Sequence, residues 1–236
     1  MTLLINGCSF TECWTPSAEF VSKLNCNNVV NIGKTGTSFQ RTARSTVEWI
    51  AQNGEPGYVV IPITFSHRWE LSIANKEDDI DGTWYPLQRK ELINKNKISK
   101  LVSTEKLELL IDLYYGSIPD IRSYWDKCFT EIIMLAGWLE NEKIPYLLFD
   151  MCNQFDRKHL KTFDGKNNYK GFEKLKFIEQ NKKIIDIFSF CGNEFMWQSL
   201  SADDKKNIDP TLYHHKDPQY RVLEDYLLNY INSCAE

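Results

Sequence analysis

The strongest constraint on the fold is the alternation of short apolar runs with amphipathic segments in the first 65 residues. The apolar runs, rich in valine, leucine and isoleucine, cover residues 3–6, 29–32 and 58–65. The segments between them, 16–24 and 37–52, repeat their apolar side chains at helical spacing. One helix between successive buried strands is typical of a parallel sheet, because a parallel connection has to cross a face of the sheet. The pattern therefore predicts a doubly wound α/β fold.

The rest of the sequence extends this pattern with less regularity. We expect a loop over 67–86, helices over about 88–115 and 119–142, a fourth strand over 145–149, a polar loop over 153–169, a helix near 171–182 and a fifth strand over 184–190. A last helix is predicted from Asp217, which can cap it, with Pro218 at its first position. Together these elements predict a single domain over residues 1–236, with three α/β/α layers around a central, mostly parallel, flavodoxin-like sheet of about five strands and a mainly helical insertion at about 67–125.

Composition and charge exclude several classes of protein. With 42% hydrophobic and 25% charged residues, the chain has the composition of a globular protein and not of a disordered one. The net charge of −4 provides no basic surface for nucleic acid or for an anionic membrane. The sequence has no basic leader and no long apolar segment, so we expect neither a signal peptide nor a transmembrane segment.

The seven cysteines indicate the compartment and argue against a metal site. Their number is odd, none of them forms a CxxC pair, and no cysteine or histidine has the spacing of metal ligands. We therefore expect free thiols in a reducing cytoplasm and no metal site. We also expect no organic cofactor.

Gly7-Cys8-Ser9 follows the first predicted strand at its carboxyl end, where open α/β sheets bind ligands. Two interpretations of Ser9 are open from these residues alone: a nucleophile on a tight turn, or part of a strand stop that caps a helix. Cys8 is a further candidate, as a thiol nucleophile. Neighbouring residues after a strand point in opposite directions, however, so only one of the two side chains should face a pocket.

A second glycine-containing segment, "VVNIGKTGTS" at residues 29–38, follows the second strand. Asn31, Gly33 and Gly36 lie between a strand and a helix, where backbone N–H groups can face an anion or an oxyanion. The segment ends like a phosphate-binding P-loop. Strand-like residues replace the flexible part of that loop, so we reject this interpretation.

Polar side chains also gather after the third strand and again in the loop before the last helix. They are Ser66, His67, Arg68, Glu70, Asp209, His214 and His215. A histidine beside a serine can act as a general base, and an arginine can bind an anion. The alternative interpretation is a surface ion pair of Arg68 with Glu70 and two solvated surface histidines.

The four groups together resemble the SGNH (GDSL-like) hydrolase family. The opening Gly7-Cys8-Ser9-Phe10-Thr11 is most similar to phage and bacterial members that begin with GCSFT. The resemblance implies that Ser9 is the nucleophile and His215 the base, with His214 as its alternative. It also implies an oxyanion hole formed by the N–H groups of Ser9 and Gly36 and by the Ser66 side chain. The residues placed around the substrate are Asn31, His67 and Arg68.

The sequence departs from the family pattern in three ways. Cys8 stands where the family has an aspartate, and Ser66 stands where it has an asparagine. The acid of the family's Asp-x-x-His motif is absent three residues before either histidine. Asp209, and Asp150 at the end of the fourth strand, are the alternative partners for the base.

The resemblance implies a serine esterase or acyl hydrolase that removes O-acetyl or other small acyl groups from a glycan or a small ester. It would act in the cytoplasm, which is the host cytoplasm if the protein is phage-encoded, without nucleic acid or membrane partners. The alternative is an SGNH-fold phage protein of weak or no activity that acts in binding or in virion–host interaction. The missing acid favours this alternative, as do the aromatic residues Trp69, Trp84, Tyr85, Tyr114, Tyr115 and Trp125. They can line a sugar site, form a protein interface or fill the core of the insertion.

Overall fold

The computed structural model describes residues 1–66, 68–72, 84–87, 104–113, 121–152, 155, 172–206 and 217–235. The predicted site residues His67, Asp209, His214 and His215 lie outside these ranges, as does most of the polar loop predicted over 153–169. Within these ranges no helix is both long enough and apolar enough to span a membrane.

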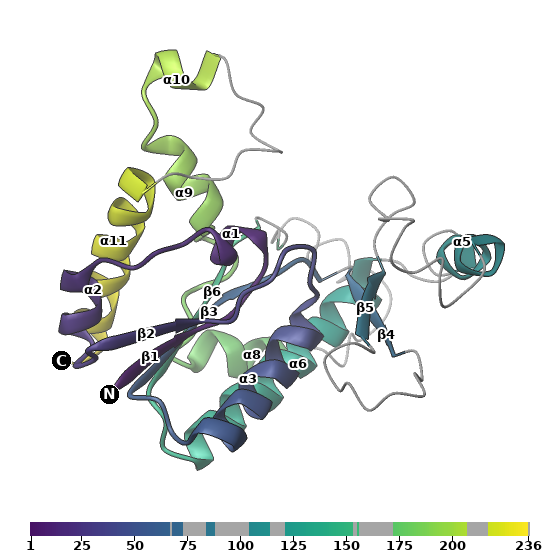
Figure 1. The fold of residues 1–236 in the computed structure, drawn as a ribbon, viewed down its shortest axis with the longest axis horizontal. Coiled ribbons are helices and arrows are strands. Elements are labelled where there is room, and N and C mark those ends of the chain that lie inside the picture. Colours follow the sequence, from purple (N-terminus) through teal and green to yellow (C-terminus); the bar gives the residue numbers. More distant parts are fainter. Residues whose placement is uncertain are drawn as a thin grey trace.

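A four-stranded parallel sheet forms the centre of the fold, with its strands in the order β2-β1-β3-β6 (Figure 1). The strands are β1 (Thr2–Ile5), β2 (Asn28–Asn31), β3 (Tyr58–Ile63) and β6 (Tyr146–Asp150). Leu3 of the central strand β1 pairs with Val29 on one side and with Tyr58 on the other. All four strands coincide with apolar runs of the sequence, and the predicted parallel α/β class is confirmed.

The fifth strand predicted over 184–190 is reduced to one parallel bridge, between Ile184 and Leu148. Asp186 ends the pairing, because its carbonyl accepts hydrogen bonds from the N–H groups of Ser189 and Phe190 and so folds the apolar run into a turn. With the bridge included, the spatial order is the 2-1-3-4-5 order of flavodoxin-like sheets. The point where this order reverses lies between β1 and β3.

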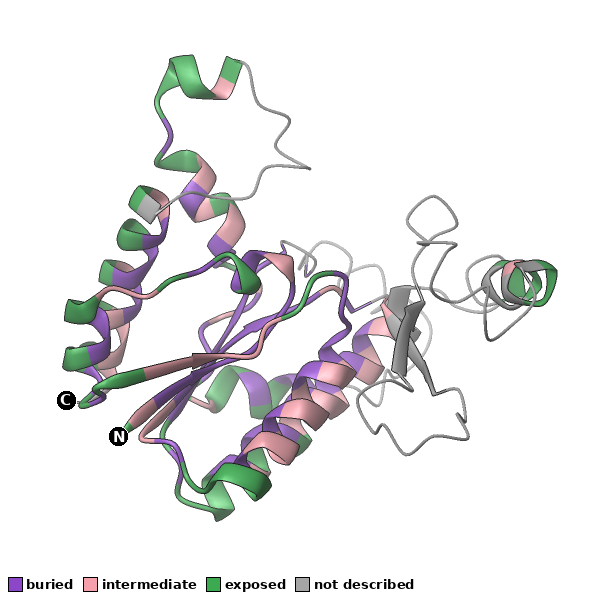
Figure 2. Ribbon diagram, in the orientation of Figure 1, coloured by how far each residue is buried: buried purple, intermediate pink, exposed green. Residues whose placement is uncertain are grey.

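Helices cover both faces of the sheet and bury its side chains in two clusters (Figures 1 and 2). The helices of one layer are α3 (Phe39–Asn53), α6 (Ile121–Asn141) and α8 (Phe172–Gln180). Those of the other layer are α2 (Ala18–Lys23), α9 (Gly192–Gln198) and α11 (Asp217–Ala235). Leu4 and Leu148 face the first layer, whereas Leu3 and Leu147 face the second. This alternation along each strand produces the predicted three-layer α/β/α architecture.

Local signals in the sequence set the helix ends in the first part of the chain. The Ser17 hydroxyl caps α2 by accepting a hydrogen bond from the Phe20 N–H at 3.0 Å. Ser38 caps α3 in the same way, from the Arg41 N–H at 3.1 Å. Gly54 follows α3 with a φ of 87°, a left-handed conformation that favours glycine. Both helices predicted in this part are therefore present.

The insertion differs from its prediction. Part of the loop predicted over 67–86 forms β4 (Trp69–Ser72) and β5 (Trp84–Leu87), an antiparallel pair in which Glu70 lies opposite Pro86. The sequence gives no hairpin signal for this pair, because each strand has four residues and the eleven residues 73–83 separate them, far more than a tight turn. Of the helix predicted over about 88–115, the structure describes α5 (Thr104–Asp112), and residues 88–103 lie outside the described ranges. The helix predicted over about 119–142 corresponds to α6.

Candidate active site

The turn after β1 is anchored to α3 by Asn6, a fully buried residue. Its Nδ2 donates hydrogen bonds to the carbonyl of Thr42 and to the hydroxyls of Ser45 and Thr46, all at 2.9 Å. Its Oδ1 accepts a hydrogen bond from the Gly7 N–H, also at 2.9 Å. Both N–H groups of the Asn6 amide are thus engaged, one of them shared between two acceptors, and the side chain fixes the direction in which the chain leaves the strand. Sequence reasoning treated Asn6 only as the end of a strand.

Ser9 is the first residue of a short helix, α1 (Ser9–Glu12), and is half-buried. Gly7 allows this helix to fold back tightly, because a Cβ at that position would lie 2.1 Å from Thr11 Oγ1 and 3.2 Å from the carbonyl of Pro62. Cys8, between them, is fully buried. Of the two candidate nucleophiles only Ser9 is partly exposed, and within the described part of the chain its hydroxyl makes no hydrogen bond.

The buried Cys8 thiol has an unusual environment. Its pKa is lowered from 9.0 to about 7, chiefly because the Cys152 thiol donates a hydrogen bond to it, although burial acts in the opposite direction. The Phe10 backbone and the positive charge of Arg68 lower the pKa further. Burial raises the pKa of Cys152 well above its ordinary value, so Cys152 keeps its proton and remains a donor. The positive charge of Arg68 thus acts on the residue before Ser9.

The loop after β2 is fastened to α1 by two side chains. Asn31 Nδ2 donates to the carbonyls of Thr11 at 2.7 Å and Trp14 at 3.0 Å, and its Oδ1 accepts from the Gly33 N–H at 2.9 Å. Glu12 accepts hydrogen bonds from both the N–H and the hydroxyl of Thr35. We expected Asn31 beside the substrate, but its amide is occupied by the backbone and holds the loop in place.

Gly36, the glycine predicted to contribute to the oxyanion hole, lies at the end of the loop after β2. It is buried and has a φ of 79°, a left-handed conformation that favours glycine. Because β1 and β2 are neighbouring parallel strands, the loops that carry Ser9 and Gly36 leave the same end of the sheet side by side.

The segment after β3 is joined to the loop after β2 by Arg68. Its Nη1 donates to the carbonyl of Thr37, next to Gly36, at 3.3 Å, and its guanidinium lies 4.5 Å from the ring centroid of Phe65. Ser66, between Phe65 and Arg68, is buried at the same end of the sheet. The structure therefore brings the loops of three neighbouring strands together at the position where doubly wound sheets bind their ligands.

Helix α11, near the C-terminus, packs against α1 near the N-terminus. The Tyr220 hydroxyl donates to the carbonyl of Phe10, and the Tyr220 ring stacks on Trp14 with centroids 5.9 Å apart. Tyr220 is in the first turn of α11, so the start of this helix contacts the residue next to Ser9.

A buried carboxylate, Glu224, completes the attachment of α11. Its side chain is 2% exposed and accepts hydrogen bonds from Trp14 Nε1 and the Ser17 N–H, both at 3.0 Å, and from the Ser17 hydroxyl. Arg221, one turn earlier on α11, donates to both of its oxygens at 3.0–3.1 Å. The sequence signal for this contact is its spacing, since Glu224 stands four residues after Tyr220, on the buried face of the helix.

Asp150, an alternative partner for the histidine, is buried at the end of β6. Its Oδ1 accepts a hydrogen bond from the Cys152 N–H at 3.1 Å. Because β3 separates β6 from β1, Asp150 is about 10 Å from the β1 end, and it can act on Ser9 only through an intervening group. Among the residues the structure describes, no three His, Cys, Asp or Glu side chains are grouped as a metal site.

No protein-family model and no curated protein matches this sequence. Solved structures with a similar chain path include a Bacteroides fragilis protein provisionally named an acylhydrolase, which is 14% identical with a TM-score of 0.48 over 100% of this chain and 88% of that one. A Desulfitobacterium hafniense protein, provisionally named a lipolytic protein of the G-D-S-L family, is 13% identical with a TM-score of 0.44 over 97% and 98%. A catalytic mutant of an acetylxylan esterase from Geobacillus stearothermophilus is 16% identical with a TM-score of 0.44 over 98% and 93%. These similarities assign neither a family nor an activity to the chain.

Proposed function

We propose that this protein is a serine-dependent ester hydrolase of the SGNH type. The observation that carries the proposal is the position of Ser9, which is half-buried at the carboxyl end of β1, next to the point where the strand order reverses. A serine hydroxyl becomes a useful nucleophile when a neighbouring base can take its proton. Within the described residues no hydrogen bond occupies the Ser9 hydroxyl, and so it is available to such a base.

In the proposed reaction, Ser9 Oγ attacks the acyl carbonyl carbon while His215, or His214, takes the hydroxyl proton. The histidine then gives the proton to the leaving alcohol, which leaves an acyl-serine. Water, activated by the same histidine, attacks the acyl-serine and releases the carboxylic acid and the free serine. We favour small acyl esters as substrates, such as O-acetyl groups of glycans, because the sequence resemblance implies them.

The negative charge of the tetrahedral intermediate requires donors that are held in place before the reaction. We assign this role to the N–H groups of Ser9 and Gly36 and to the Ser66 hydroxyl. As the first residue of α1, Ser9 has no acceptor for its N–H within that helix. Arg68 adds a positive charge nearby, and among the described residues no carboxylate pairs with it.

The experiment is turnover of p-nitrophenyl acetate and p-nitrophenyl butyrate by the wild type and by the Ser9→Ala, His214→Ala and His215→Ala variants. Ser9→Ala should lower kcat by about 10³-fold or more, and one of the two histidine variants should do the same. Ser22→Ala on α2 is a control that removes a serine hydroxyl away from the site. Far-UV circular dichroism checks that every variant is folded.

Two outcomes would contradict the proposal. The first is a folded wild type that turns over neither ester. The second is turnover that Ser9→Ala leaves unchanged, which would make the Gly7-Cys8-Ser9 segment a structural turn.

A further inference from the structure

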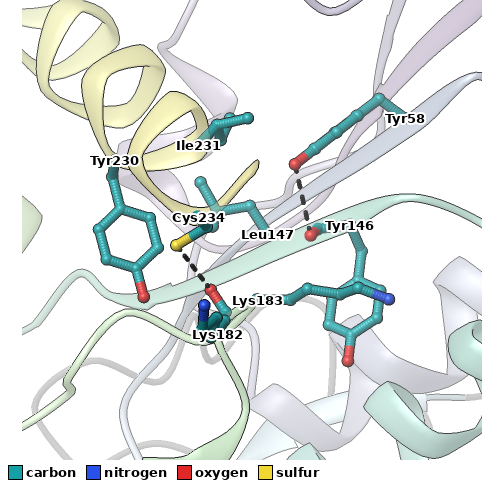
Figure 3. A pocket seen from close by; sticks show the side chains of 8 residues that line it. All are labelled: Tyr58, Tyr146, Leu147, Lys182, Lys183, Tyr230, Ile231 and Cys234. Atoms are coloured by element: carbon teal, nitrogen blue, oxygen red, sulfur yellow. Dashed lines mark hydrogen bonds between the residues drawn. The ribbon is translucent and has the colours of Figure 1, made fainter. Parts of the chain in front are cut away.

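A pocket of about 180 Å³ opens at the amino end of the sheet, opposite to the end that carries Ser9 (Figure 3). Its lining residues are Tyr58, Tyr146, Leu147, Lys182, Lys183, Tyr230, Ile231 and Cys234. Tyr58 and Tyr146 begin β3 and β6, whereas Tyr230, Ile231 and Cys234 project from the last turns of α11. Because active sites of doubly wound sheets form at the carboxyl ends of the strands, the proposed hydrolysis does not account for this pocket.

Two of the three tyrosine hydroxyls at the pocket are weakly held donors, whereas the third, that of Tyr146, donates to Glu140 Oε1 at 2.8 Å. Tyr58 donates to the carbonyl of Tyr146 at 3.4 Å, and Tyr230 donates to the carbonyl of Ile184 at 3.5 Å. Both distances are at the long limit for O–H donors, so a better acceptor could capture either hydroxyl. Burial raises the pKa of both tyrosines to about 12, which keeps these hydroxyls protonated at neutral pH.

The two lysines at the pocket differ in the partners of their ammonium groups. Lys183 Nζ lies 5.0 Å from the ring centroid of Tyr146 and 4.0 Å from Glu140 Oε1. In the part of the chain that the structure describes, Lys182 has no carboxylate within ion-pair distance. Among the described residues, the pocket thus carries one positive charge that no carboxylate pairs, together with two phenol donors.

The remaining lining of the pocket is apolar. Leu147 is buried in the sheet, Ile231 is partly buried on α11, and the tyrosine rings add aromatic surface. A volume of about 180 Å³ is below the range of about 300–1,000 Å³ for drug-sized ligands. The shape and lining therefore suit a small ligand with a compact apolar body.

We propose that this pocket binds a small organic carboxylate with an aromatic ring or a short alkyl chain. The carboxylate pairs with Lys182 and accepts hydrogen bonds from the Tyr58 or Tyr230 hydroxyl, and the apolar body packs on Leu147 and Ile231. The site is independent of the proposed ester hydrolysis, and its test does not require turnover.

The chain contains its own reporter for the test. Cys234 lines the pocket and is partly exposed, whereas Cys13 is exposed beyond α1 at the other end of the sheet. The five remaining cysteines are buried. Mass spectrometry can therefore follow the alkylation of Cys234 and of Cys13 by iodoacetamide in the same sample, with sodium benzoate as the probe and benzamide as its uncharged counterpart.

Benzoate should slow the alkylation of Cys234 with a saturable dose dependence, by about tenfold at ten times its Kd, because only the ligand-free form reacts. Cys13 should be unaffected, and benzamide should protect neither thiol. Lys182→Gln should abolish the protection, whereas Lys176→Gln, an exposed lysine on α8 outside the pocket, should retain it. The proposal is overturned if benzoate and benzamide act alike, if both thiols are slowed equally, or if Lys182→Gln is still protected.

Discussion

Replacing Glu224 with alanine measures how strongly α11 is attached to the segment that carries Ser9. The substitution leaves two N–H groups without an acceptor, the indole of the buried Trp14 and the backbone of Ser17. Each loss is worth about 1–3 kcal/mol when the acceptor is a charged group in a buried site, and the deleted side chain leaves a small cavity. We expect the free energy of unfolding to fall by about 3–5 kcal/mol.

Glu48→Ala on α3 is a matched control for this change. Glu48 also receives both of its arginine contacts from one turn away, with Arg44 Nη1 at 2.9 and 3.0 Å, but its side chain is 35% exposed. A pair of this kind on a helix surface contributes about 0.5 kcal/mol. The difference between the two variants therefore measures the contacts that Glu224 makes with Trp14 and Ser17, together with the cavity that its removal leaves.

Urea unfolding followed by tryptophan fluorescence gives the free energy for both variants, with the slope m as a check that the transition stays two-state. The reasoning is refuted if Glu224→Ala is no more destabilising than Glu48→Ala. That result would mean that the hydrogen bonds to Glu224 contribute nothing beyond a surface ion pair.

Two further predictions concern the turn after β1. Gly7→Ala should destabilise the protein by about 1–3 kcal/mol, because the added Cβ would lie 2.1 Å from Thr11 Oγ1. Its control is Gly137→Ala, inside α6 with open space around the added Cβ, which should stabilise the protein by about 1 kcal/mol. Urea unfolding measures both, and shifts of the same sign would contradict the packing argument. Because the pKa of Cys8 is lowered from 9.0 to about 7 by the Cys152 thiol, the stability that its ionisation provides is full above pH 9 and is lost as the pH falls through 7. The gap in unfolding free energy between wild type and Cys8→Ala should widen by on the order of 1 kcal/mol from pH 7 to pH 9, and a constant or narrowing gap would disprove the shift.

Strands β1, β3 and β6 of the central sheet could be predicted because they are buried on both faces. Leu3, Leu4 and Ile5, like Val59, Val60 and Ile61, are fully buried, and such strands are continuous apolar runs in a sequence. The elements that the sequence did not reveal are short. The five-residue α10 (Ala202–Lys206) has no buried residue and therefore no apolar period.

Packing, and not local sequence, positions α9. A Cβ on Gly192, its first residue, would lie 2.8 Å from Met151 Sδ and 2.9 Å from the Phe149 ring. The glycine is therefore required for the close approach of α9 to the end of β6. A single glycine after an apolar run carries no such information until the partner side chains are known.

In the candidate site, too, some features follow from local sequence and others depend on packing between distant residues. The positions of Ser9, Gly36 and Ser66 follow from topology alone, since each comes after a strand of one parallel sheet. The hydrogen bonds of Asn31 with Thr11 and Trp14, and of Glu224 with Trp14 and Ser17, join groups far apart in the sequence. Helical spacing places Glu224 on the buried face of α11, but the sequence does not identify these partners. Asn31 stands at the carboxyl end of a strand, where a ligand-binding residue is expected. Its side chain instead hydrogen-bonds to backbone groups of Thr11, Trp14 and Gly33.

The contacts of α11 with the first helix also determine when the protein can fold during synthesis. Tyr220 and Phe10, like Glu224 and Trp14, are joined across 210 residues of sequence. When β1, α1 and α2 have been synthesised, the surface that covers Trp14 is still missing. It belongs to α11, which is synthesised more than two hundred residues later. Long-range contacts of this kind slow folding and leave apolar side chains exposed in the meantime. Translation that stops before α11 would thus release a chain with an open apolar face, a substrate for chaperones and proteases.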